Sequence, residues 1–509
     1  MNPGEISGSA ANGVTGTHVR VVVVGAGIAG IGAALRLAAE GERDFLLLER
    51  NADVGGTWLD NVYPGVACDV PSHLYSFSFA PKPDWPQYFA DGAQIQDYLR
   101  SCTAGPEFRD RLSLETDLLH AQWEEDQAHW SLTTSRGELT ASFLVLATGR
   151  FSTPRLPAIP NLAEFDGPVV HTARWQDLDV PGQRIGVIGT GASAAQLVPA
   201  LAQRSAELTV FQRSPPWVVP KGNRPYSPTE QALFVEDDQA RRRHRSSIVA
   251  EMDAGLGARF SGSCAHADLR RRVLKHLESE VPDPALRAQL TPDYEPGCKR
   301  VLLSDDWYRS LQRENVVLEP SALASVSGST ATAASGASYA VDALVFATGF
   351  LASRPAIAAA VTGRERSLAE HWSAGMTSYA STVVTGFPNM FILGGPHSAL
   401  GHNSAVEILE TQIEHLLSAL AHLPTGSVCE VAAEAEEHYS AAVHARAEQT
   451  VWTGCSNWYR DQQTGRVTLL WPDTAESYRR QHSRFAPDMY RIRTPAPGPA
   501  DRTPATVDA

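Results

Sequence analysis

The sequence is poor in cysteine. Its six cysteines are far apart, and none forms a C-x-x-C or C-x-x-x-x-C pair; they are Cys68, Cys102, Cys264, Cys298, Cys429 and Cys455. Zinc sites and redox-active dithiols depend on such close pairs, and small disulfide scaffolds on a denser set. The sequence therefore predicts no disulfide framework, no metal site and no redox dithiol, which is typical of a protein of the reducing cytoplasm.

Positive charge is also scarce. The chain has 43 Lys and Arg against 57 Asp and Glu, which gives a formal net charge of −14. Nucleic-acid binding needs a basic surface, so nucleic acid is excluded as the main partner and any anion site must be local. The Arg-rich stretches near residues 240 and 270 are interleaved with acids. They are typical of solvated helix faces, and we expect a helical insert at about 222–296.

A membrane partner is not expected either. Residues 21–39 are apolar but contain four glycines and Arg36. A strand, a turn and a helix explain this stretch better than a transmembrane helix does. At the two ends, the Gly- and Ser-rich residues 1–17 predict a disordered arm, and the Pro-rich residues 494–509 predict a disordered tail.

The first part of the chain carries a dinucleotide-binding pattern in its full context. An apolar strand at 19–24 runs into the turn glycines Gly25, Gly27 and Gly30, a helix to about residue 40 and a second strand at 45–48 that ends at Glu49. Such glycines let a pyrophosphate approach the backbone and the helix N-terminus, and the terminal carboxylate accepts hydrogen bonds from ribose hydroxyls. An acid at this place repels a 2′-phosphate, so the unit suits FAD.

The same pattern returns after a strand at 184–188. Gly189, Thr190, Gly191 and Ala194 form the turn, a helix follows at 195–203, and the next strand, 208–212, ends at Arg213. Glu49 and Arg213 each stand 24 residues after the first glycine of their unit (49 − 25 and 213 − 189). A guanidinium binds phosphate with a planar fork, so this second unit suits NADPH rather than NADH.

Two "ATG" segments, at 143–150 and 343–350, run an apolar strand into a glycine. A strand at 387–398 and a helix at about 404–421 favour a return to the first unit. We therefore expect an α/β fold with two Rossmann-like domains, the second inserted in the first. The expected FAD domain comprises 18–150 and the return segment 383–493, and the expected NADPH domain comprises 151–382.

Residues 55–69, "GGTWLDNVYPGVACD", resemble the motif of Baeyer–Villiger monooxygenases, with every defined position met. A second family motif is similar to Phe165–Trp175, although Gln176 stands where that motif has Pro or Asp. Trp175 favours this family over the related N- and S-oxygenating flavin enzymes, which remain the nearest alternative. The resemblance implies FAD, NADPH, O2 and a ketone substrate, with oxygen insertion to an ester or lactone through a flavin 4a-peroxide.

The resemblance also implies site residues. We expect FAD contacts beyond the first glycine turn at Gly56, Thr57, Trp58, Asp69 and Tyr75. Further NADPH contacts are expected at Ser193, Gln196, Ser214 and Lys299. His171 and Trp175 are expected in the hinge between the nucleotide domains, with His171 as a hydrogen-bonding group rather than a base.

The mechanism is expected to depend on Arg300. It stands beside Lys299 before an apolar strand at 301–303, and the side chains of an extended chain alternate in direction. Arg300, paired with Asp69, would face the anionic peroxide and adduct, where a charged donor is worth about 3–4 kcal/mol. Lys299 would face the 2′-phosphate.

Other possibilities stay open. A flavin disulfide reductase needs a close dithiol, which the sequence lacks; a flavoprotein electron carrier would not need Arg300. The aromatic residues Trp452, Trp458, Tyr459 and Trp471 either line a substrate pocket or pack the core. The sequence does not indicate which ketone is oxidised.

Overall fold

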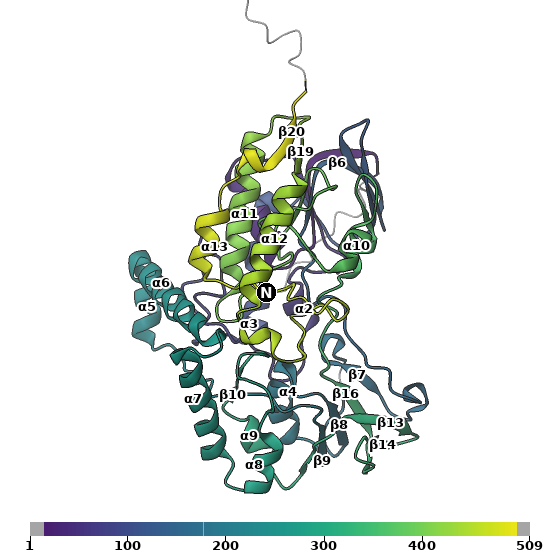
Figure 1. The fold of residues 1–509 in the computed structure, drawn as a ribbon, viewed down its shortest axis with the longest axis vertical. Coiled ribbons are helices and arrows are strands. Elements are labelled where there is room, and N and C mark those ends of the chain that lie inside the picture. The colour runs from purple at the N-terminus through teal and green to yellow at the C-terminus, as the bar shows by residue number, and fades with distance from the viewer. Residues whose placement is uncertain (1–14, 177, 496–509) are drawn as a thin grey trace, which may run out of the picture.

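The computed structural model describes residues 15–176 and 178–495. Its core consists of two separate sheets, one in each half of an elongated molecule (Figure 1). The predicted arm at 1–17 falls mostly outside the described residues. Where it is described, it is wrong at its end, because Thr17 already pairs with Leu139 in the first sheet. The tail beyond residue 495 also lies outside the described part.

The first sheet has a parallel core in the order β18-β6-β1-β2-β3. On the other side of β6, β5 and β4 continue the sheet in antiparallel pairing, and β17 pairs with β4 in parallel. The N-terminal part of β6 pairs with β5, and its C-terminal part pairs with β18. The strands are β1 (Thr17–Val24), β2 (Phe45–Leu48), β3 (Leu112–Ser113), β4 (Leu118–Glu124), β5 (His129–Thr134), β6 (Gly137–Leu146), β17 (Val361–Thr362) and β18 (Met390–Ile392).

The second sheet is parallel throughout, in the order β12-β9-β8-β16-β7. Its strands are β7 (Val169–His171), β8 (Arg184–Ile188), β9 (Glu207–Phe211), β12 (Val316–Glu319) and β16 (Ala343–Phe346). Because β17 and then β18 return to the first sheet only after β16, the last strand of the second, the second unit is inserted in the first. The expected fold class is therefore confirmed.

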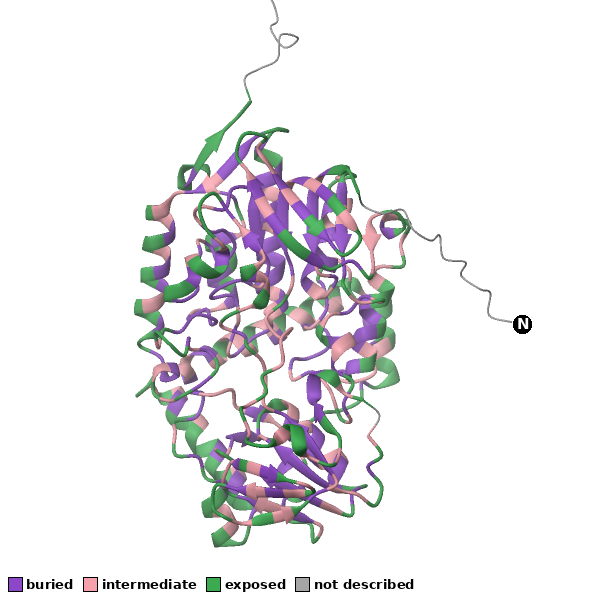
Figure 2. Ribbon diagram, turned by 90° about the vertical axis from the view of Figure 1, so that its right-hand side faces the viewer, coloured by how far each residue is buried: buried purple, intermediate pink, exposed green. Residues whose placement is uncertain are grey.

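Burial explains why these segments form central strands. Val21, Val22 and Val23 have no exposed surface, as expected for a parallel strand covered on both faces. The apolar residues of α1 and α11 pack with one face of the first sheet, and the other face packs against the segment near Trp372 and Phe387. Both sheets are buried in Figure 2. The helices of the first half are α1 (Ile28–Ala39), α2 (Thr57–Asp60), α3 (Gly92–Cys102), and those of the return segment are α11 (Ala405–His422), α12 (Ala433–Ala447) and α13 (Ala475–His482).

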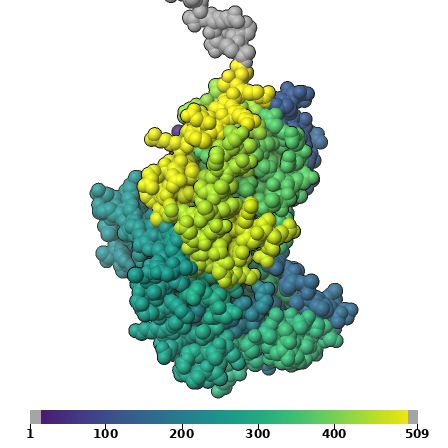
Figure 3. Space-filling model, viewed as in Figure 1, coloured from purple at the N-terminus to yellow at the C-terminus, as the bar shows by residue number. Residues whose placement is uncertain are grey.

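A helical layer lies between residues 228 and 290 and joins the two halves. It consists of α5 (Pro228–Glu236), α6 (Asp238–Ala254), α7 (Cys264–Glu280) and α8 (Pro284–Leu290). Arg245 of α6 forms a half-buried ion pair with Glu407 of α11 at 2.5 Å, and Asp253 accepts a hydrogen bond from the backbone of Ala475. The surface in Figure 3 accordingly runs without a break from this layer (teal) to the return segment (yellow).

The remaining elements are short. The second half also contains α4 (Ala192–Ala202), α9 (Trp307–Ser310), the paired strands β10 (Val218–Val219) and β11 (Leu302–Leu303), and the small sheet β13 (Leu323–Ser327), β14 (Thr330–Ala333) and β15 (Ser338–Ala340). The first half also contains α10 (Leu368–His371), β19 (Val428–Val431) and β20 (Tyr490–Arg493). In the described part of the chain, no helix is both long and apolar enough to span a bilayer.

Candidate active site

The first glycine turn is shaped by two close approaches. Gly25 has a φ of +102°, and a Cβ there would lie 2.7 Å from the carbonyl oxygen of Ala147. A Cβ on Gly30 would lie 1.8 Å from the carbonyl oxygen of Gly25. Helix α1 then begins after Gly27, and no described side chain caps its N-terminus. Its first N–H groups are therefore available to an anionic ligand.

Glu49 stands beside this turn as expected. Its Oε2 accepts a hydrogen bond from the backbone N–H of Ala26 at 2.8 Å, and its Oε1 accepts one from Asn51 at 2.9 Å. The side chain is buried. Each carboxylate oxygen keeps a second lone pair, so ribose hydroxyls can still bind.

The 55–58 segment meets the first turn directly. Gly56 has a φ of +55°, and a Cβ there would lie 2.9 Å from the Cα of Gly27. Thr57 begins α2, and the Trp58 indole donates a hydrogen bond to the Tyr75 hydroxyl at 3.3 Å. The predicted FAD contacts therefore lie around one turn, and their binding roles stay predictions.

The second glycine turn repeats this geometry. Gly189 has a φ of +111°, and a Cβ there would lie 2.6 Å from the carbonyl oxygen of Ala347. Helix α4 begins after Gly191 and includes Ser193 and Ala194 in its first turn; no described side chain caps it. No described atom lies within 4 Å of the place of a Cβ on Gly191. Both turns thus fit a pyrophosphate.

Arg213 and Ser214 are held against this second turn. The Thr190 hydroxyl donates a hydrogen bond to the carbonyl oxygen of Ser214 at 2.7 Å. Arg213 is exposed. The Lys299 ammonium lies 4.3 Å from the centre of the Tyr294 ring, and burial, followed by the positive charge of Arg213, lowers its pKa. Two cations that repel each other fit an anion such as a 2′-phosphate.

Arg300 faces away from Lys299 and pairs with Asp69. Its Nε donates a hydrogen bond to Asp69 Oδ2 at 2.6 Å, and both side chains are about one-third exposed, at 27% and 30%. Burial acts to raise the pKa of Asp69, but the positive charges of Arg300 and Lys221 hold it below its ordinary value. The Asp69 charge in turn raises the pKa of Arg300. The pair therefore stays ionised, with a charged guanidinium at the junction of the two halves.

Lys221 belongs to this group although no motif in the sequence points to it. It is half-buried, burial lowers its pKa, and the negative charges of Asp69, Asp91 and Asp305 act in the opposite direction. Its backbone N–H donates a hydrogen bond to Asp305 Oδ1 at 2.8 Å. Lys221 lies 152 residues from Asp69 in the sequence, so only the fold could reveal that the two are neighbours.

Gln196 joins the two halves. Its Oε1 accepts a hydrogen bond from the Tyr63 hydroxyl at 2.8 Å, and its Nε2 donates one to the carbonyl oxygen of Ala67 at 2.8 Å. The structure therefore places the amide of this predicted NADPH contact between α4 and the segment that leads to Asp69. Its role toward NADPH stays a prediction.

The predicted hinge residues lie at the edge of the second sheet. His171 ends β7, and its Nδ1 accepts a hydrogen bond from the backbone N–H of Ala173 at 3.1 Å. Burial lowers the pKa of His171, which keeps the ring neutral. The centre of its ring lies 6.0 Å from that of Phe350, the last residue of the second "ATG" segment. Trp175 is half-buried against the apolar core around the second sheet. A hinge role stays a prediction.

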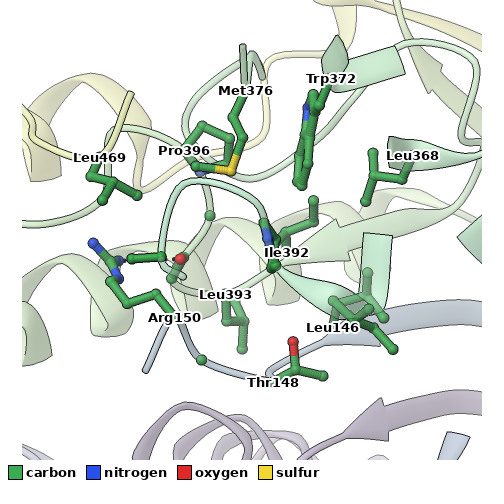
Figure 4. A pocket seen from close by; sticks show the side chains of 16 residues that line it. Leu146, Thr148, Arg150, Leu368, Trp372, Met376, Ile392, Leu393, Pro396 and Leu469 are labelled. Carbon is green, nitrogen blue, oxygen red and sulfur yellow. Dashed lines mark hydrogen bonds between the residues drawn. The ribbon is translucent and has the colours of Figure 1, made fainter. Parts of the chain in front are cut away.

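Arg150 is a half-buried cation at the end of the first "ATG" segment. Its Nη2 donates hydrogen bonds to Ser398 Oγ at 2.6 Å and to the Gly394 carbonyl at 3.1 Å, and Nη1 has no partner among the described residues. Burial lowers its pKa to about 10. The guanidinium borders a cavity of about 30 Å³ that includes Thr148 and Trp372 (Figure 4), which is large enough for one water molecule.

Three of the four C-terminal aromatic residues belong to the core. Trp452, Tyr459 and Trp471 are buried, whereas Trp458 is exposed and packs on Phe151 at 5.5 Å between ring centres. In this same segment the prediction of no disulfide is wrong. Cys298 and Cys455 form a disulfide across 157 residues. Sequence spacing could not reveal it, because the pairing depends on how the two halves pack together.

Comparison with known proteins agrees with this geometry. Residues 22–229 match the family model described as pyridine nucleotide-disulphide oxidoreductase. The chain is 40% identical over 498 residues to a Baeyer–Villiger monooxygenase of Streptomyces coelicolor, with 96% of each protein covered.

Two crystal structures extend the comparison. Cyclohexanone monooxygenase from Rhodococcus sp. Phi1 bound to NADP+ is 26% identical with a TM-score of 0.85, covering 94% of this chain and 100% of that one. OTEMO in complex with FAD and NADP is 27% identical with a TM-score of 0.83, covering 93% and 99%. With its two nucleotide turns, its Arg300–Asp69 pair and this degree of identity, the chain belongs to the Baeyer–Villiger monooxygenase family, whose members depend on FAD and NADPH.

Proposed function

We propose that this enzyme inserts one oxygen atom of O2 next to the carbonyl of a ketone, giving an ester or lactone. The observation that supports this most directly is the Arg300–Asp69 pair, which lies where the segment from the first turn meets the strand β11. Reduced FAD supplies the activation of oxygen. Arg300 supplies a permanent positive charge near the reacting atoms, and it cannot lose its proton to an anion there.

Asp69 orients the guanidinium in this proposal. Its charge keeps Arg300 protonated and fixes Nε, which leaves the two terminal nitrogens free to stabilise an anionic adduct. Arg213, Ser214 and Lys299 bind the 2′-phosphate of NADPH from the opposite side. Glu49 and the first glycine turn bind FAD. A cytoplasmic location remains part of the proposal, although the disulfide removes one of its grounds.

The experiment compares wild type, Arg300→Ala and Arg300→Lys with NADPH, O2 and a panel of ketones, amines and sulfides. We expect Arg300→Ala to lose ester formation by about 10²- to 10³-fold, while NADPH still reduces the flavin and oxygen is released as hydrogen peroxide. Arg300→Lys keeps the positive charge but loses the planar guanidinium, so it tests whether ester formation needs that planar group or only the charge.

Two results would contradict this proposal. Ester formation retained by Arg300→Ala would remove Arg300 from the reaction. Products only from amines or sulfides, identified by mass, would instead favour an N- or S-oxygenase.

A further inference from the structure

The Cys298–Cys455 disulfide lies beside the Arg300–Asp69 pair, and neither cysteine has a role in the proposed reaction. Cys298 is fully buried and stands two residues before Arg300. Cys455 belongs to the return segment, directly after the turn at Val451–Thr453. The disulfide therefore connects the loop that carries Arg300 to the far end of the chain.

Asn457 reinforces this connection. Its amide nitrogen donates hydrogen bonds to the carbonyl oxygens of Cys298 at 3.0 Å and of Trp452 at 2.7 Å, and its Oδ1 accepts one from the backbone N–H of Tyr459 at 3.0 Å. The side chain is buried. One amide thus holds the backbone of both segments. We call Cys298, Cys455 and Asn457 the clamp.

The loop before Arg300 is irregular, and its first part is held at Tyr294, which accepts a hydrogen bond from the Trp217 indole at 2.7 Å and donates one to the Pro215 carbonyl at 2.9 Å. Between the end of α8 at Leu290 and the start of β11 at Leu302, no described residue belongs to a helix or strand. Beyond Arg300, β11 is anchored on β10, and Asp69 holds the guanidinium itself. On the N-terminal side the clamp holds Cys298, two residues before Arg300 and nearer to it than the Tyr294 anchor. Removal of the clamp would free the backbone that sets the position of Arg300.

We propose that the clamp positions Arg300, and that reduction of the Cys298–Cys455 disulfide uncouples NADPH consumption from ester formation. Reduction transfers two electrons and two protons from a dithiol to the two sulfurs, giving two thiols and a disulfide of the reductant. The inference rests on the proposed role of Arg300. A displacement of about 1 Å in a reacting group can cost about 10²-fold in rate, so a small shift of this loop is sufficient.

The first measurement establishes the disulfide. The unreduced enzyme is alkylated with iodoacetamide in denaturant and its mass is determined. We expect four labelled cysteines before reduction and six after it, since Cys68, Cys102, Cys264 and Cys429 are free. Six labels without reductant would overturn the proposal at once.

The second measurement compares the wild type before and after dithiothreitol, the double variant C298A/C455A, and Asn457→Ala, with Cys264→Ser as control because Cys264 is an exposed free cysteine. The substrate is the best ketone of a panel of cyclohexanone, acetophenone and 2-dodecanone. We expect ester formed per NADPH consumed to fall about tenfold or more in the reduced enzyme and both clamp variants, with a matching rise in hydrogen peroxide.

Anaerobic flavin reduction by NADPH separates positioning from general damage. At saturating NADPH we expect its rate to stay within about twofold of wild type, because Arg213 and the second turn do not touch the clamp. The KM for NADPH is expected to rise, since Lys299 stands next to Cys298. Dithiothreitol should not change the double variant further. Ester yield per NADPH that is unchanged in both the reduced wild type and the double variant would overturn the clamp. Ester formation by Arg300→Ala would instead overturn the proposed function.

Discussion

Arg213 and Lys299 place two positive charges near the second glycine turn. Burial, followed by the positive charge of Arg213, lowers the pKa of Lys299. A 2′-phosphate would relieve this repulsion, and NADH has no such group. Each charge-assisted hydrogen bond to the phosphate is worth about 1.5–3 kcal/mol.

We therefore predict that Arg213→Ala lowers the ratio of kcat/KM for NADPH over NADH by about 10- to 100-fold. The change should come from NADPH, with kcat/KM for NADH nearly constant. Arg204→Ala is a suitable control, because Arg204 is also an exposed arginine and stands just after the end of helix α4. An unchanged ratio in Arg213→Ala would exclude the phosphate role.

At the scale of elements, one glycine in each turn shows a different requirement: Gly30 is needed for packing, and Gly191 for access of the nucleotide. Gly30 packs helix α1 against the turn, since a Cβ there would overlap the Gly25 carbonyl at 1.8 Å. Gly191 has open space around it and a φ of −78°, which any residue adopts. The same substitution should therefore act on stability at one position and on the nucleotide at the other.

We predict that Gly30→Ala destabilises the protein by about 1–3 kcal/mol or prevents its folding, through overpacking. Gly191→Ala should leave the melting temperature of the protein within about 1 °C, since its Cβ meets no described atom, but raise the KM for NADPH at least about tenfold. Thermal denaturation and steady-state kinetics measure the two effects. A normal KM for NADPH in Gly191→Ala would mean that the pyrophosphate lies elsewhere.

Elements were predictable wherever local pattern and burial agree. The strands β2 and β8 have the predicted bounds, and α11 lies within one residue of its predicted bounds. Helix α1 ends within one residue of its predicted end but begins earlier than expected, at Ile28 inside the glycine pattern. Contacts between distant segments were predictable only where a family motif linked them, as for Asp69 and Arg300. Lys221 near Asp69, Gln196 bonded to Tyr63, and Cys298 paired with Cys455 have no local signal. Each depends on how the two halves pack, which periodicity does not encode.

At the scale of the whole molecule, buried histidines set the response to acid. Four buried histidines of the first half and the return segment have strongly lowered pKa values: His73, His397, His415 and His482. Burial lowers the pKa to about 3 for His73, His397 and His482 and to about 4 for His415. The folded protein therefore holds these rings neutral.

The sign of the pH effect follows from the lowered pKa values. Below pH 6.5 the unfolded chain protonates these rings and the folded chain does not, so the free energy of unfolding falls as pH falls toward about 4. Each ring contributes a slope of about 1.4 kcal/mol per pH unit, and nothing above pH 7. We predict a urea midpoint that is constant from pH 7 to 8 and falls steadily from pH 6.5 to 5. Equal midpoints at pH 7 and pH 5 would show that the rings titrate normally.

The strand order also fixes a sequence of events during synthesis. β6 ends at Leu146, but its partner β18 begins only at Met390, and α11 follows from Ala405. The second sheet, from β7 to β16, is complete at Phe346. At about 5–20 residues per second, the edge of β6 waits on the order of 10–50 seconds on the ribosome for its partner. The NADPH-type unit can therefore close while the flavin-type unit still lacks β18 and α11, so completion of the flavin-type sheet follows that of the NADPH-type sheet.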